Sequence, residues 1–144
     1  MALYSADGVP ENGSSVSESE TVLRCVPPST WDWDEDGPTT ASLSFRKGEI
    51  ALSVYLLKLL ETRGLGASDT RERRERHGVV SFSASLAYTV GCVLTHSPAE
   101  SDPPLQVDFA HADLHKMEKA AWLVARDRLL EGAETVIRPQ DGRG

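Results

Sequence analysis

Short apolar segments broken by glycine and proline constrain the fold of this chain more than any other feature of its sequence. The segment at residues 22–26 stops at a double proline, and later segments stop at Gly64, Gly91 and Gly132. Segments of this length are typical of strands and of short helices. A membrane span needs about 18 consecutive apolar residues, and the sequence has no such run. The pattern predicts a small domain that mixes strands with helices.

The turn and cap residues divide these segments into individual elements. We expect strands in TVLRCVPP, CVLTHSP, VDFAH and ETVIRP, and a hairpin in ASLSFRKGEIALSVYL with its turn at Lys47-Gly48. We expect one helix over residues 112–130, ended by Gly132, and a polar helix capped by Ser68 or Asp69 and ended by Gly78. The apolar VYLLKLL either extends a strand or begins a short helix.

The segment VVSFSASLAYTVG fits two structures. Val80, Phe82 and Leu86 belong to an alternation of apolar and small polar residues, which is the period of a strand. Phe82 and Leu86 also recur every four residues, as in a helix that starts at Ser81 and stops at Gly91. Because alanine and serine are poor strand formers, we favour a helix over residues 81–90.

The chain of 144 residues is long enough for one domain with its own core. Residues 1–20 are rich in serine and carry four carboxylates and no basic residue, so we expect a disordered acidic leader. Residues 21–139 then form a single α+β domain, and residues 140–144 form a frayed tail. The fold expected for the domain is a small mixed β-sheet with two to three helices packed mainly on one face.

The net charge of −7 makes nucleic acid an unlikely partner and favours a partner with a basic surface. The start of the chain has neither the basic nor the apolar region of a signal peptide, and Cys25 and Cys92 form no metal or redox motif. We therefore expect a reduced, cytoplasmic protein with no cofactor and no membrane contact, and an exported domain with one disulfide is the alternative. The sequence leaves open whether the protein forms a homo-oligomer.

The stretch DFAHADLH is the strongest candidate for chemistry. On a helix, His111 and His115 would project from one face, and Asp108 is the nearest third ligand for a metal such as zinc. The motif HExxH has a glutamate where this chain has Ala112, so the general base of that motif is missing. We favour structural roles at the start of a helix and keep a metal site or a His-dependent enzyme at Asp108, His111 and His115 as the alternative.

The stretch TWDWDEDG gathers two tryptophans and four carboxylates. As an exposed docking loop, it would offer Trp31 and Trp33 as aromatic anchors and Asp32, Asp34 and Asp36 to a basic partner. In the plainer alternative, both tryptophans cover one face of the sheet while the aspartates point to water. The spacing of an EF-hand calcium loop is absent.

The basic run at residues 71–76 predicts a solvated helix with internal ion pairs. Arg71, Arg73, Arg74 and Arg76 alternate with Glu72 and Glu75, which partly cancel their charge. A nucleic-acid binder that uses these arginines is the weakest of the functional hypotheses.

The order of WDWDEDG, LSVY and HADL over residues 22–138 resembles a loose group of small uncharacterised bacterial proteins. The resemblance implies a bacterial cytoplasmic setting and attaches no activity to any residue. The absence of any complete catalytic constellation in the sequence, the acidic aromatic loop and the acidic leader lead us to expect a non-enzymatic protein-binding or regulatory accessory protein. Such a protein would act with a neighbouring gene product, as an antitoxin or a defence accessory does.

Overall fold

The computed structural model describes residues 13–140, and an antiparallel sheet of six strands forms the centre of this part. The strands lie in the order β6-β7-β4-β1-β5-β8, and each neighbouring pair is antiparallel. Their bounds are β1 Thr21–Val26, β4 Ala51–Leu56, β5 Gly78–Ser83, β6 Leu94–His96, β7 His111–His115 and β8 Glu134–Ile137. The expected α+β class is confirmed, with an antiparallel sheet in place of a mixed one.

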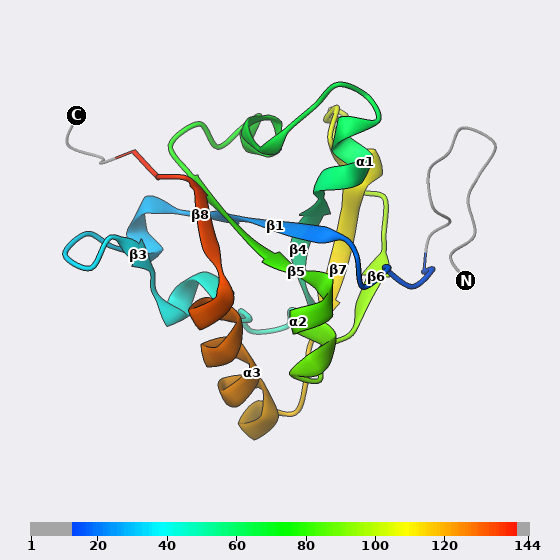
Figure 1. Ribbon diagram of the computed structural model, residues 1–144. Coiled ribbons are helices and arrows are strands. Elements are labelled where there is room, and N and C mark those ends of the chain that lie inside the picture. Colours follow the sequence, from blue (N-terminus) through cyan, green and yellow to red (C-terminus); the bar gives the residue numbers. More distant parts are fainter. Residues whose placement is uncertain (1–12, 141–144) are drawn as a thin grey trace.

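The helices lie on both sides of this sheet. The helices α2 (Ala84–Thr89) and α3 (Lys119–Gly132) lie side by side on one side, and the short α1 (Leu57–Glu61) lies on the other (Figure 1). The two longer helices pack closely, since a Cβ atom on Gly132 would come within 2.5 Å of a methyl carbon of Leu86. Gly132 therefore both ends α3, as expected, and makes room for α2.

The face of the sheet opposite α2 and α3 is also covered. Side chains alternate between the two faces along β1, yet both Val22 and Leu23 are fully buried. Cys25, on the same face as Leu23, lies against Thr70 of the 3₁₀ turn Ala67–Arg71. A strand buried on both faces reads as an almost continuous apolar run, which explains the sequence of β1.

The segment HADLH is a strand, and the expectation that a helix starts at residue 112 is wrong. β7 pairs with β4 over all five of its residues. Ala112 and Leu114 are buried, while His111 and His115 are half-buried on the other face. The helix α3 begins seven residues later, because the carboxylate of Glu118 accepts hydrogen bonds from the first amides of the helix, those of Ala120 and Ala121, at 3.0 and 3.1 Å.

The ambiguous segment at residues 81–90 divides into a strand and a helix. The strand β5 runs to Ser83, and α2 begins at the next residue. The N-cap is Ser83 and not Ser81, since the Ser83 hydroxyl accepts a hydrogen bond from the Leu86 amide at 3.0 Å. The period of two was correct for the first half of the segment, and the period of four was correct for the second.

Three further expectations fail locally. The first strand of the expected hairpin is absent, and a 3₁₀ turn, Thr40–Leu43, stands in its place, although Gly48 does form a turn, with φ of +86°. The polar helix expected before Gly78 is only the 3₁₀ turn Ala67–Arg71 followed by irregular turns. Its glutamates and arginines supply no apolar face to pack, and packing stabilises most protein helices. The segment VDFAH likewise forms the 3₁₀ turn Asp108–Ala110 before β7 begins.

Residues 13–16 run along the outer edge of β6. The Gly13 amide donates to the His96 carbonyl at 2.6 Å, and the His96 amide donates to the Ser14 carbonyl at 2.8 Å. Val16 is buried, and its carbonyl accepts a hydrogen bond from the Tyr88 hydroxyl at 2.6 Å. Residues 1–12 of the acidic leader and residues 141–144 of the tail lie outside the described residues, whereas residues 13–20 pack against the domain.

Candidate functional site

The carboxylate of Asp108 holds a loop together. It accepts hydrogen bonds from the Ser101 hydroxyl at 2.7 Å, the Ser101 amide at 3.2 Å and the Leu105 amide at 3.0 Å. Burial alone would raise the pKa of Asp108, but these hydrogen bonds hold it below its ordinary value. A cavity of about 500 Å³ lies beside this carboxylate, and neither His111 nor His115 lines it.

The two histidines of β7 lie on the same face of the strand and make separate contacts. Four residues of strand place their Cα atoms about 13 Å apart. The His111 ring bonds through Nδ1 to the Ser97 carbonyl and meets the Tyr55 ring edge-on at 5.6 Å. His115 Nε2 lies 2.7 Å from the Thr95 hydroxyl.

The other two histidines do not complete a cluster. His96 pairs with Ala112 across the β6–β7 ladder, so its side chain lies on the opposite face of the sheet from His111. His77 precedes β5 on the far side of β1. Within residues 13–140, no three or more histidines, cysteines, aspartates or glutamates gather in a way that could hold a metal ion.

The two tryptophans of WDWDEDG have different roles. A small hairpin of β2 (Trp31–Asp32) and β3 (Gly37–Pro38) carries the loop. Trp31 is only 4% exposed and packs with Val26 and Val80, whereas Trp33 is 37% exposed. The expectation that both tryptophans act alike is wrong, because β2 ends at Asp32 and the alternation of a strand stops there.

Backbone and side-chain hydrogen bonds fix the shape of this loop. One oxygen of Asp32 accepts from the amides of Asp34 and Glu35, both at 3.0 Å. The Trp31 indole donates to the Asp36 carboxylate at 3.2 Å. Asp36 itself has a φ of +56°, a conformation that aspartate tolerates better than most residues. The loop is therefore preorganised, with Trp33, Asp34 and Glu35 turned to solvent.

Arg138 ties the loop to the end of β8. Its guanidinium donates to the Asp36 carboxylate and lies 5.3 Å from the centre of the Trp33 ring. A guanidinium within about 6 Å of an aromatic ring makes a favourable cation–π contact. The hydrogen bonds from Arg138 and then from Trp31 hold the pKa of Asp36 below its ordinary value. We call residues 31–36 and 134–138 together the loop–edge surface.

The strand β8 gives this surface an open sheet edge. It is the last strand of the sheet, and no strand among the described residues pairs with its outer side. Glu134, Thr135 and Val136 are all exposed. A strand in this position presents unpaired amides and carbonyls, to which an extended segment of another chain can add. The sequence predicted the strand but gave no sign that the loop lies beside it.

The arginines of residues 71–76 do not form one basic face. Arg71 donates to the carbonyls of Glu75 and His77 at 3.1 and 3.4 Å, and Arg73 donates to the Pro103 carbonyl at 2.7 Å. Arg74 instead lines a cavity of about 320 Å³, together with Arg24 and Arg46. Sequence reasoning missed this cavity, although one signal was visible: Arg24 stands inside the otherwise apolar strand segment VLRCV.

Comparison with the models of known protein families, with curated proteins and with solved structures finds no match. The resemblance to small bacterial proteins therefore stays a prediction. None of the helices within residues 13–140 has the length and apolar character that crossing a bilayer requires.

Proposed function

We propose that this protein binds another protein through the loop–edge surface. One observation carries the proposal: the exposed Trp33 ring contacts Arg138 at the end of β8, an edge strand whose outer side is not paired with any described strand. Tryptophan is the residue type most enriched among the side chains that dominate binding energy at interfaces. A ring that a neighbouring side chain already restrains loses less conformational freedom when a partner covers it.

Charge indicates the kind of partner. Asp34, Glu35 and Asp36 are exposed on the loop, and Glu134 is exposed on the strand. Arg138 is the counter-charge of Asp36 within this group. An extended segment that carries lysine or arginine would add to β8 through backbone hydrogen bonds and would meet these carboxylates with its side chains.

The state of the other candidate residues favours binding over catalysis. Asp108, His111 and His115 are each engaged in hydrogen bonds that hold loops and strands in place. We include in the proposal a cytoplasmic accessory role beside a neighbouring gene product, which rests on the resemblance of WDWDEDG and HADL to a bacterial group.

An affinity capture with three variants of the full chain tests the proposal. Trp33→Ala removes the anchor, and Val136→Lys places a charge on the open edge that repels a basic segment. Val124→Lys is the matched control, because Val124 is exposed on α3, outside the loop–edge surface. Circular dichroism first establishes that all three variants fold.

The expected result is a stoichiometric partner that is retained by the unmodified chain and by Val124→Lys and lost from the other two variants. A partner that all variants retain equally would place the interface elsewhere. If the folded, unmodified chain retains no stoichiometric partner from its own cell extract, the proposal fails.

A further inference from the structure

We infer that the cavity lined by Arg24, Arg46 and Arg74 binds the phosphate group of a small molecule. The cavity measures about 320 Å³, at the lower end of the range of roughly 300–1,000 Å³ that is common for ligand pockets. It is independent of the loop–edge surface. We call this cavity the arginine pocket.

The arginine pocket exists because β1 and β4 separate. β1 pairs with β5 over all six residues but pairs with β4 only at Val22 and Leu23. Beyond Leu23, the side chain of Arg24 bridges the gap, donating from Nη1 to the Ser53 carbonyl at 2.9 Å and from Nε to the Ser42 carbonyl at 3.2 Å. A charged side chain here replaces the ladder bonds that the strands would otherwise form.

Arg24 is therefore held in place, while some of its N–H donors have no protein acceptor within residues 13–140. A guanidinium has five N–H donors, and only two of those on Arg24 have a protein acceptor among the described residues. Burial lowers the pKa of Arg24 from its ordinary value; Cys25 and Glu49 act against this effect, and the nearby charges of Arg74 and Arg46 add to it. An anion would accept from the remaining donors and relieve this unfavourable environment.

Two arginines from different segments complete the pocket. Arg46 comes from the turn that Gly48 makes, and Arg74 comes from the turns after Ala67–Arg71. Neither guanidinium has a hydrogen-bond or ion-pair partner in the part of the chain that the structure describes. Both are exposed, so they lie at the rim of the pocket while Arg24 lies deeper.

The charges of the lining match a dianion. Glu49 is the one carboxylate that lines the pocket, and it is partly used, since it accepts the Arg46 amide at 2.6 Å. Three guanidinium charges against one carboxylate leave two positive charges in a chain whose net charge is −7. Burial, then Arg74 and Arg24, lower the pKa of His77, so this ring is neutral at neutral pH. The paired N–H donors of arginine match phosphate and carboxylate alike, so it is the surplus of two positive charges that favours a dianionic phosphate over a monovalent carboxylate.

Calorimetric titration of the full chain tests the inference. The probes are inorganic phosphate and glycerol phosphate, with acetate as the carboxylate, all at a constant ionic strength set with chloride. Arg46→Gln and Arg74→Gln each remove one rim charge at an exposed position. Arg76→Gln is the matched control, because Arg76 is an exposed neighbour of Arg74 that does not line the pocket.

The expected result is saturable binding of at least one phosphate compound, weakened about tenfold by Arg46→Gln and by Arg74→Gln and unchanged by Arg76→Gln. A preference for glycerol phosphate would identify a monoester as the ligand, and equal binding would identify free phosphate as sufficient. No saturable binding, equal weakening by all three variants, or acetate binding as tightly as phosphate would each overturn the inference.

Discussion

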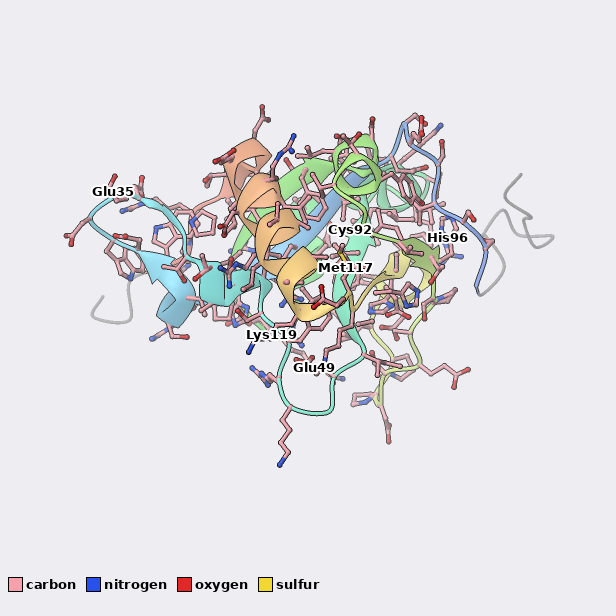
Figure 2. All side chains as sticks on the ribbon, turned by 90° about the horizontal axis from the view of Figure 1, so that it is seen from below. Glu35, Glu49, Cys92, His96, Met117 and Lys119 are labelled. Carbon is pink, nitrogen blue, oxygen red and sulfur yellow. The ribbon has the colours of Figure 1, made fainter. Side chains whose placement is uncertain are left out.

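The two outer edges of the sheet differ in whether another segment of the chain covers them. The edge of β6 is covered, because residues 13–16 run beside it and exchange backbone hydrogen bonds with Leu94 and His96. The edge of β8 has no such cover within residues 13–140. Figure 2 shows His96, on the covered edge, and Glu35, at the tip of the loop beside the open edge, at opposite ends of the molecule.

The difference shows what a segment needs in order to close an edge. Residues 13–16 supply backbone donors and acceptors, and the burial of Val16 together with the hydrogen bond from Tyr88 holds the segment in place. The open edge is instead short, has a bulge opposite Val79 and Val80, and carries the exposed Glu134. Bulges, shortness and charge are devices that limit indiscriminate strand pairing, so the partner proposed for β8 is expected to be one whose segment fits the bulge and carries the opposite charge.

The largest loss of stability is expected when Val16, which holds residues 13–16 against the covered edge, is replaced. Val16→Asp places a carboxylate at a position that is 3% exposed, and it should lower the free energy of unfolding by at least about 2 kcal/mol. Urea unfolding measures this loss. The control is Ser15→Asp, which adds the same charge at an exposed neighbour. Equal urea midpoints for the two variants would show that residues 13–16 do not hold the edge.

A smaller effect is expected on the pH dependence of folding stability, through His96 on the same edge. Burial lowers the pKa of His96 below the ordinary value of about 6.5. As the pH falls through that value, the unfolded chain takes up a proton on this ring before the folded chain does, so stability decreases. The urea midpoint should therefore fall less between pH 7.5 and pH 5.5 in His96→Gln than in the unmodified chain. His77 and Glu20 are present in both proteins, so their contributions cancel in the comparison, and parallel curves would contradict the prediction.

The smallest effect is expected on the pKa of Asp36, beside the open edge. The folded-state pKa of Asp36 lies below its unfolded value, so its contribution to stability is present above about pH 4 and is lost as the pH falls through the folded pKa. Arg138→Gln removes the first cause of this shift. The pKa of Asp36, followed by NMR of its carboxyl carbon, should rise toward the ordinary value. An unchanged titration would mean that Arg138 does not link the loop to β8.

The sequence predicted the parts of the fold that local chemistry determines. The strands β1, β6 and β8, the turn at Gly48 and the end of α3 at Gly132 follow from apolar segments and their flanking residues. HADLH was assigned to a helix because two buried residues, Ala112 and Leu114, are too few to establish a period of two. Its strand form depends on pairing with β4, which is distant in sequence.

The candidate sites depend still more on distant contacts. The loop WDWDEDG was visible as an acidic aromatic segment, but its neighbour Arg138 lies 102 residues away. Arg24 was visible as a charge within an apolar strand, but the arginine pocket arises because β1 stops pairing with β4 after Leu23. Neither the register nor the neighbour can be read from local patterns.

Hydrogen–deuterium exchange of the full chain, alone and with its captured partner, tests whether the loop–edge surface is the interface. The partner is expected to slow exchange at residues 31–36 and 134–138, where the loop–edge surface lies. No change is expected at β6, because residues 13–16 already occupy that edge. Slower exchange at β6, with none at β8 or the loop, would show that the interface is not the loop–edge surface.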